Sequence, residues 1–129
     1  MTLVLMRLEH FLGKIESNEL EKILDELKKR TQDGFNEFWI SDDVDYPCIC
    51  VSYNSDFAHV HFFEEEGDCG KQLVSKDNNE GTTEFYTNAP NESFYIDNMY
   101  VVNAKGANEL VIDFCEGKNI VEKYEFEEL

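Results

Sequence analysis

Apolar residues in the first quarter of the chain follow the spacing of an amphipathic helix. Four of them recur at i, i+3, i+4 and i+7, namely Leu20, Ile23, Leu24 and Leu27, which places them on one helical face. Asn18 lies three residues before Glu21, the spacing of a capping box, and the cations at 28–30 suit a last helical turn. We therefore predict a helix that begins after Asn18 and ends near residue 30.

A second helical pattern follows Asn103. Its apolar residues gather along one side, at Ala104, Ala107, Leu110, Val111 and Phe114. Asn103 is a favourable N-cap and Gly117 a favourable stop. Gly106 opposes the helix by about 1 kcal/mol relative to alanine. These signals predict a second amphipathic helix that Gly117 ends.

The other apolar segments have the alternation or the branched and aromatic content of β-strands. We predict strands at 1–9, 47–53, 57–64, 72–75, 82–87 and 120–126, with 99–102 extended and 88–91 a loop. Gly13 is assigned to a link, and Asn54-Ser55-Asp56 to the turn of a hairpin. Strand 57–64 is bulky on both faces, which predicts a central position. The chain should be one α+β domain, 1–129, with a mainly antiparallel twisted sheet of about six strands and two amphipathic helices packed against it.

The net charge of the chain narrows the classes of partner that it is expected to bind. The 129 residues, 42% of them hydrophobic, suffice for one core, and 28 Asp and Glu against 11 Lys and Arg give a net charge of -17. Such a surface repels phosphate backbones and anionic membranes, so we expect no nucleic-acid or membrane partner. It speeds encounter with a cationic protein. The alternative is that the acidity serves solubility alone.

The start of the chain and the cysteines bear on location. Arg7 and Glu9 interrupt the apolar run near the start, which argues against a signal peptide, and no segment approaches the roughly 20 apolar residues that span a bilayer. We therefore expect a cytoplasmic protein. Its four cysteines are then expected to be reduced thiols, and they are Cys48, Cys50, Cys69 and Cys115.

Two thiols and two imidazoles occur on adjacent strands of the predicted hairpin, at Cys48, Cys50, His59 and His61. These are ligand types that zinc prefers, but structural zinc sites usually take paired thiols from turns. If Tyr53 pairs with Asp56, all four side chains share a face. If Tyr53 pairs with Phe57, the cysteines and histidines lie on opposite faces. We predict buried thiols beside half-buried histidines, with no metal and no cofactor.

Motifs for catalysis are absent from the sequence. It has no glycine-rich phosphate loop, no Gly-x-Ser-x-Gly elbow and no His-Glu-x-x-His. Cys115 falls near the C-terminal end of the second predicted helix, where the helix dipole raises a thiol pKa. We therefore expect a protein that is not an enzyme and has no catalytic residues.

Acidic residues concentrate in two short loops that flank the predicted hairpin. The predicted partner-binding residues are Asp42, Asp43, Asp45, Tyr46, Glu64, Glu65, Glu66 and Asp68. Phe62 and Phe63 lie beside the second loop. An acidic rim around aromatic anchors suits recognition of a basic protein surface. The alternative is a pair of ordinary solvated turns.

Several segments of the chain resemble the first-numbered family of immunity proteins of bacterial polymorphic toxin systems. The matching segments are Tyr46-Pro47 with the strand to Tyr53, Asp56 to Phe63, Glu64 to Gly70, Gly81 to Phe85, Ile96-Asp97-Asn98 with Val101-Val102, and Glu109 to Gly117. The resemblance covers roughly 46–124. The family often has a tryptophan in its final strand, where this chain has Tyr124 and Phe126, and the one tryptophan here is Trp39.

The resemblance implies a non-enzymatic α+β protein that neutralises a toxin made by the same cell, often a nucleic-acid-modifying enzyme such as a deaminase. It implies no particular functional residues. The acidity agrees with it, because a toxin that acts on nucleic acid presents a basic groove that an acidic inhibitor can occupy as a phosphate mimic. The expected partner is therefore a cognate toxin domain with a basic surface.

Overall fold

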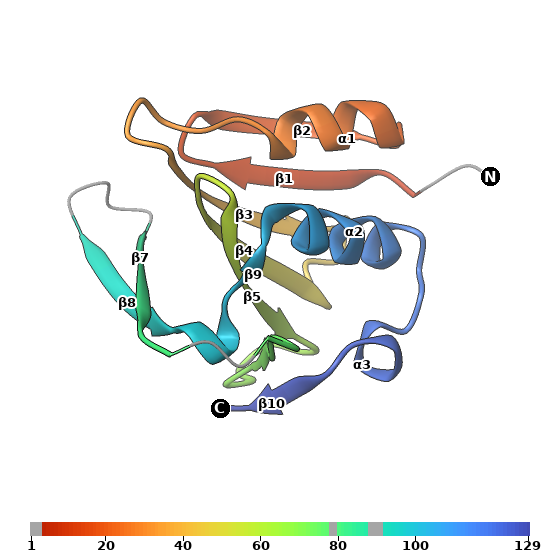
Figure 1. Cartoon of the computed structure of the whole chain (residues 1–129). Coiled ribbons are helices and arrows are strands. Elements are labelled where there is room, and N and C mark those ends of the chain that lie inside the picture. The colour runs from red at the N-terminus through yellow and green to blue at the C-terminus, as the bar shows by residue number, and fades with distance from the viewer. Residues whose placement is uncertain (1–3, 78–79, 88–91) are drawn as a thin grey trace.

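The computed structural model describes residues 4–77, 80–87 and 92–129, and an eight-stranded antiparallel sheet forms its centre (Figure 1). The strands are β1 (Met6–His10), β2 (Gly13–Ser17), β3 (Phe35–Ser41), β4 (Cys48–Asn54), β5 (Phe57–Phe63), β6 (Lys71–Leu73), β9 (Val102–Asn103) and β10 (Phe126–Glu128). Their order is β10-β6-β5-β4-β3-β1-β2, and β9 pairs with β5. The predicted central position of the β5 segment is thus confirmed.

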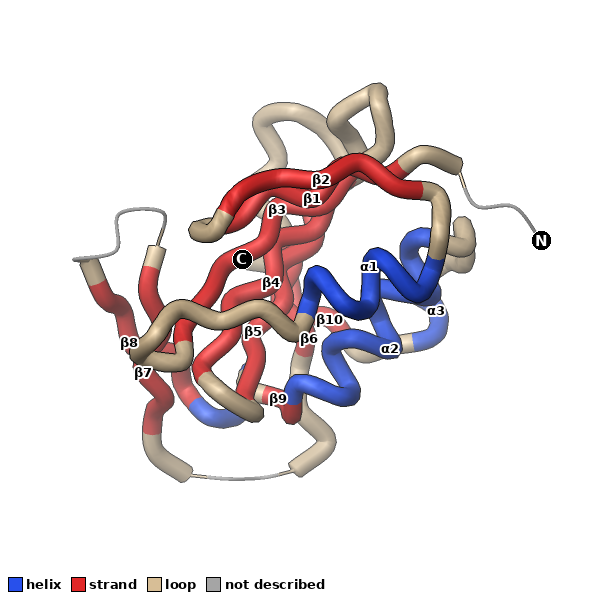
Figure 2. Tube along the Cα trace, turned by 90° about the horizontal axis from the view of Figure 1, so that it is seen from above, coloured by secondary structure: helices blue, strands red, loops and turns tan. Residues whose placement is uncertain are grey.

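Helices and a hairpin cover opposite faces of this sheet. The helices are α1 (Leu20–Leu27), α2 (Ala104–Cys115) and the short α3 (Ile120–Lys123), and a 3₁₀ turn spans Asn98–Tyr100. The strands β7 (Thr82–Tyr86) and β8 (Ser93–Asp97) form a separate two-stranded sheet. Figure 2 shows α1 and α2 on one side of the main sheet and β7–β8 on the other. The molecule therefore has three layers.

The main core lies between the sheet and the two longer helices. The strands contribute Leu8, Phe38, Ile40, Ile49, Val51, Tyr53, Ala58 and Val60, and the helices contribute Ile23, Leu27, Ala107, Leu110 and Val111, all fully buried. Burying a large side chain of this kind contributes about 1.5–3 kcal/mol. Because strand side chains alternate between faces, the intervening residues of β3, β4 and β5 line the opposite face of the sheet.

The predicted fold class is confirmed, since the structure is α+β with a mainly antiparallel sheet and packed helices, although the sheet has more than the expected six strands. The second helix is also confirmed. The Asn103 side chain accepts a hydrogen bond from the Gly106 amide at 2.6 Å. A β-carbon at position 106 would lie 3.2 Å from that Asn103 oxygen, which favours the glycine there. Gly117, at φ 78°, follows the end of the helix as predicted.

The predicted ends of the first helix were wrong. Its N-cap is Glu19 and no side-chain capping bond forms, while the Ser17 hydroxyl accepts a hydrogen bond from the Glu19 amide at 3.0 Å. The helix ends at Leu27, and the cations at 28–30 follow it. Arg30 donates to the Leu27 carbonyl at 2.6 Å, so a side chain satisfies a terminal carbonyl of the helix.

The predicted strand at 120–126 was also wrong. Residues Ile120–Lys123 form α3, and the strand begins at Phe126. Lys123 and Tyr124 both reach back to the Asp113 carboxylate of α2, at 2.7 Å and 2.6 Å. These two contacts hold the segment in a helical turn against α2.

Smaller differences concern the edges of the sheet. The first strand begins at Met6, and the segment assigned to a link at Gly13 is the edge strand β2. Strand β8 was not predicted. The predicted strand at 72–75 lies one to two residues earlier, and most of 99–102 belongs to the 3₁₀ turn and its cap. The predicted loop at 88–91 lies outside the described residues.

Candidate functional site

The two acidic loops lie at the same end of the central strands. Ser41 at the end of β3 pairs with Cys48 at the start of β4, and Cys48 pairs with Phe63 at the end of β5. The loop 42–47 leaves β3 there, and the loop 64–70 leaves β5 at the same level. The predicted partner-binding residues, which were chosen from two separate segments, are therefore neighbours in space.

The loop 42–47 is held by polar contacts. The Asp42 carboxylate accepts from the Val44 amide at 2.9 Å, and Arg7 donates to the Asp42 carbonyl at 2.8 Å and to the Asp45 carboxylate. The Asp45 contact raises the pKa of Arg7. Tyr46 is 37% exposed and precedes a cis proline bond. Asp42 and Asp45 therefore shape and close this loop.

The loop 64–70 uses its acids in a similar way. The Asp68 carboxylate accepts from the amides of Gly70 and Glu64, at 3.0 Å and 3.2 Å, and these bonds lower its pKa. Glu64 forms an ion pair with Lys71 at 2.7 Å. Gly70 is at φ 89°, and a β-carbon there would lie 2.7 Å from the Phe63 ring, so glycine is required.

Three acids remain available at this end of the sheet. Within the described ranges, no ion pair involves Asp43, Glu65 or Glu66, and all three are exposed. The other acids of the predicted site, Asp45 and Glu64 among them, already have cationic or amide partners. We define Asp43, Glu65 and Glu66 as the acidic tip.

The aromatic anchors differ from those expected. Phe62 points into the helix-side core and is 7% exposed. Phe63, on the opposite face, stacks on Trp39 of β3 with ring centroids 5.8 Å apart. Trp39 is 38% exposed, and its indole donates to Glu37 at 3.2 Å. Sequence analysis missed Trp39, because the pairing of β3 with β4 that brings it beside Phe63 has no local signal.

A small hollow of about 110 Å³ lies beside this aromatic pair. Its lining residues are Arg7, Glu9, Trp39, Ser41 and Asp45. Two carboxylates and the face of an indole are groups that attract a cation. Arg7 already forms an ion pair with Asp45. An incoming cationic side chain would therefore compete with Arg7 for Asp45 or bind at Glu9 and Trp39.

The hairpin register differs from both alternatives considered. Cys50 pairs with His61 and Ser52 with His59, across a turn of Ser55 and Asp56. Directly paired residues point to the same face, so Cys48, Cys50, His59 and His61 all lie on the face opposite the helices. Among the described residues, no group of three or more His, Cys, Asp or Glu is arranged to hold a metal ion.

Burial keeps the cysteine thiols and histidine rings on this face of the sheet uncharged. It lowers the pKa of His59 to about 4, with His61 adding to the effect, and it raises the pKa of Cys50 well above its usual value. His59 lies 3.1 Å from the Gln72 side-chain oxygen. Thiols and imidazoles in these forms make a buried polar layer under the β7–β8 hairpin, where Phe85 packs near His59.

Two further candidate nucleophiles, Ser52 and Cys115, are buried. Ser52 lies opposite Glu37 of β3 and His59 of β5, and in the part of the chain that the structure describes no hydrogen bond joins it to His59. Burial and the nearby Glu116 raise the pKa of Cys115 to about 12, so its thiol keeps its proton. All four cysteines are free, and Cys69 is the exposed one.

Comparison with known proteins adds no family. The chain matches no family model, and no curated protein matches it significantly. Across the described residues, none of the helices combines the length and apolar character needed to cross a membrane.

Proposed function

We propose that the chain is a non-catalytic immunity protein that binds and neutralises a cognate bacterial toxin, one that acts on nucleic acid. The observation that carries the proposal is the acidic tip, where Asp43, Glu65 and Glu66 from two separate loops lie at the same end of the central strands. A protein that protects the cell making the toxin acts in the cytoplasm, so we propose that location as well.

The chemistry of the tip suits a basic active-site groove. Exposed carboxylates on the two loops carry the same sign of charge as a nucleic-acid strand and steer a cationic partner toward the tip. Tyr46 and the Trp39–Phe63 stack offer aromatic surface next to that charge. Aromatic anchors of this kind supply much of the binding energy in protein interfaces, while charges raise the association rate.

Reversing the charge of the acidic tip tests the proposal. The variant carries Asp43→Lys, Glu65→Lys and Glu66→Lys, and the binding partner to assay is the product of whichever toxin-like gene lies immediately upstream. We expect about 100-fold weaker binding, mostly through a slower association rate, as measured by surface plasmon resonance. Raising the NaCl concentration should weaken the unmodified complex in the same way.

A matched control separates position from net charge. Glu21→Lys, Asp33→Lys and Glu122→Lys make the same total change at exposed positions outside the two loops. This control should bind within about threefold of the unmodified protein. Equal losses in both triple variants, or binding that is indifferent to salt, would contradict docking through the tip. An isolated gene among metabolic enzymes would count against the toxin partner itself.

A second candidate is an acidic protein-interaction module without a toxin partner, whose charge serves solubility. The internal use of Asp42, Asp45, Glu64 and Asp68 within their own loops favours it, because those acids have structural roles. Under this alternative, changing Asp42, Asp43 and Asp45 to lysine leaves partner binding intact. An enzyme is a third candidate, and stoichiometric zinc in purified protein would support its metal-dependent form.

A further inference from the structure

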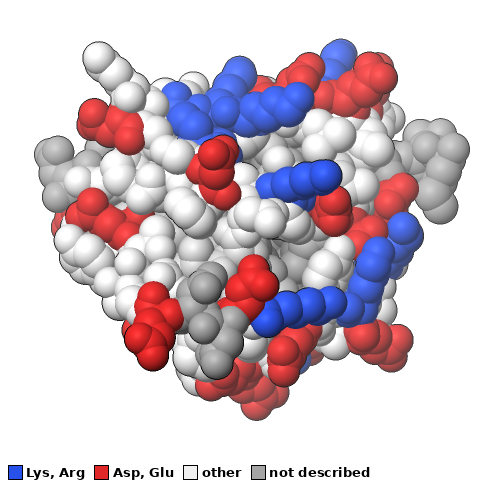
Figure 3. All heavy atoms as spheres, viewed as in Figure 1, with Lys and Arg blue, Asp and Glu red and all other residues white. Residues whose placement is uncertain are grey.

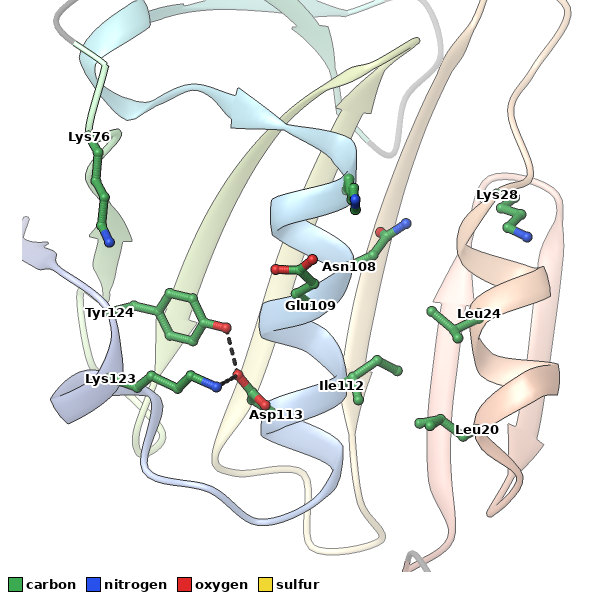
Figure 4. Close-up of a pocket in the computed structure, with 11 residues that line it drawn as sticks. Leu20, Leu24, Lys28, Lys76, Asn108, Glu109, Ile112, Asp113, Lys123 and Tyr124 are labelled. Atoms are coloured by element: carbon green, nitrogen blue, oxygen red, sulfur yellow. Dashed lines mark hydrogen bonds and ion pairs between the residues drawn. The ribbon is translucent and has the colours of Figure 1, made fainter.

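A second surface, on the helix side of the molecule, has the opposite charge. An open groove of about 830 Å³ runs between α1, α2 and the segment after α3. Figure 4 shows Leu20 and Leu24 pointing from α1 toward Ile112 of α2. These three side chains are half-buried, so part of each faces the groove and gives it an apolar floor.

Lysines surround this floor. Lys28, Lys76, Lys105 and Lys123 all line the groove. Figure 3 shows Lys and Arg side chains around uncharged surface on this face, with Asp and Glu side chains among them. Two acids also line the groove, but Asp113 is already paired with Lys123 and Lys118, which leaves Glu109. The groove is therefore locally cationic.

Three of these lysines are available to a ligand. Over the ranges that the structure covers, Lys76 and Lys105 take part in no ion pair, and Lys28 has Asp25 at 3.9 Å. Lys105 lies in the first turn of α2, where the helix dipole disfavours a cation by about 0.3–1 kcal/mol. The fold itself therefore gives no reason for a cation at this position.

We infer that this groove binds an acidic amphipathic helix of a partner protein. The apolar face of such a helix, with anchors at i, i+3, i+4 and i+7, would pack on Leu20, Leu24 and Ile112. Carboxylates along its two edges would then face Lys28 on one side and Lys76 and Lys105 on the other. Packing in the groove between two helices is a common arrangement for a third.

Charge and shape favour this occupant over others. The groove is open along its length, whereas small-molecule sites enclose most of their ligand. The net charge of -17 repels an anionic membrane, a second copy of the chain and an acidic helix alike at long range, so the preference for the helix rests on its short-range fit to the apolar floor and to Lys28, Lys76 and Lys105. The inference does not rest on the proposed function, because it concerns another face and a partner of opposite charge. Either can fail without the other.

Peptide binding to the intact protein provides the test. The probe is a designed amphipathic peptide of about 18 residues, or five helical turns, with leucines on one face and glutamates along the edges. Two further peptides serve as references: one has lysine in place of each glutamate, and one has the acidic sequence scrambled. Amide chemical-shift changes in ¹⁵N-labelled protein give the dissociation constants and the residues affected.

We expect the acidic amphipathic peptide to bind at least about tenfold more tightly than either reference. Its shifts should centre on Leu20, Leu24 and Ile112. A Lys76→Glu/Lys105→Glu variant should weaken binding about tenfold. The control Lys14→Glu/Lys22→Glu makes the same charge change at exposed positions that do not line the groove, and it should have little effect.

Several results would overturn the inference. Equal affinity for all three peptides, or equal effects of the two double variants, would show that charge complementarity does not determine binding. Shifts centred on other residues would remove the site. Binding to vesicles of anionic lipid in preference to the peptide would indicate a membrane surface, and concentration-dependent dimerisation through the groove would indicate a second copy.

Discussion

Single residues on the hairpin-covered face of the sheet are held in uncharged forms by burial. His59 is 1% exposed and faces Gln72, His61 and Phe85. Burial disfavours the imidazolium, so the pKa of His59 falls to about 4. A histidine whose pKa is lower in the folded than in the unfolded chain makes stability depend on pH.

We predict that His59 destabilises the protein as the pH falls from about 6.5 to about 4. Above this window His59 is neutral in both states, and within it the unfolded chain binds a proton that the folded chain excludes. At 1.36 kcal/mol per pKa unit, the loss is about 3 kcal/mol. His59→Gln should remove it, since glutamine is uncharged and can still donate to Gln72. Urea unfolding of both proteins across this range measures the difference.

The comparison needs a control, because His61 also has a lowered pKa and carboxylates titrate at the lower end of the window. Val60→Ala lies on the same strand and faces the helix-side core. Its free energy of unfolding should differ from the unmodified protein by an amount that does not change with pH. A parallel pH dependence in His59→Gln and the unmodified protein would refute the assignment to His59.

The acidic loops show what residue-level sequence analysis can and cannot predict. The clustering of acids along the chain predicted the two loops, and the register places both at the same end of the sheet. Which acids are already bonded depends on Arg7 and Lys71, which come from β1 and β6. Contacts between distant strands decide this, and so the acidic tip could not be selected from the sequence.

Whole elements were predictable where a local signal was strong. The helix 104–115 has its own cap at Asn103 and a glycine after its end. The apolar residues of segment 120–126 fit both the two-residue period of a strand and the spacing of a helix. Ile120 and Tyr124 both face inward, as a strand with alternating sides allows, but they are also four apart, as in a helix. The contacts of Asp113 with Lys123 and Tyr124 select the helical turn, and they come from another element.

We predict that Asp113 is the main link between α2 and α3. Its side chain is 8% exposed and its pKa falls to about 2, because the cations of Lys123 and Lys118 and the Tyr124 hydroxyl favour the charged carboxylate. Asp113→Asn should destabilise the protein by about 2–3 kcal/mol, since it leaves partly buried donors without a charged acceptor. Tyr124→Phe removes one hydrogen bond and should cost about 1 kcal/mol.

The pH dependence of these variants gives a second measurement. A carboxylate with a lowered pKa stabilises the fold above its unfolded value of about 3.9, and this contribution is lost as the pH falls toward 2. The gap between the unmodified protein and Asp113→Asn should therefore narrow over that range in urea unfolding. If Tyr124→Phe is as damaging as Asp113→Asn, packing of the tyrosine ring and not the carboxylate holds α3.

Across the whole molecule, charge is divided between two surfaces. Acids dominate at the end of the sheet that carries the acidic tip, and lysines line the groove on the helix side. The sequence predicted the net charge but not this division, because Lys28, Lys76 and Lys105 follow α1, follow β6 and begin α2, and only the fold brings these segments to one groove. The chain can thus offer separate surfaces to partners of opposite charge.

The net charge of -17 predicts that salt stabilises the folded protein. Like charges held close together repel one another in the folded state, and salt screens them over a Debye length of about 10 Å at 0.1 M. Raising NaCl from about 50 mM to about 500 mM should increase the free energy of unfolding by on the order of 1 kcal/mol. Urea is the suitable denaturant, since guanidinium chloride is itself a salt.

Two variants check that repulsion is the cause. Replacing Asp43 with Asn and Glu65 and Glu66 with Gln removes three negative charges from the acidic tip, so its gain with salt should be smaller than that of the unmodified protein. Lys14→Gln removes an exposed cation, so its free energy of unfolding should increase more with salt than that of the unmodified protein. If salt instead destabilises all three proteins, attractive pairs such as Arg7–Asp45 and Lys71–Glu64 outweigh the repulsion. The negative charge would then not destabilise the fold, and no binding function would be needed to explain why the chain is so acidic.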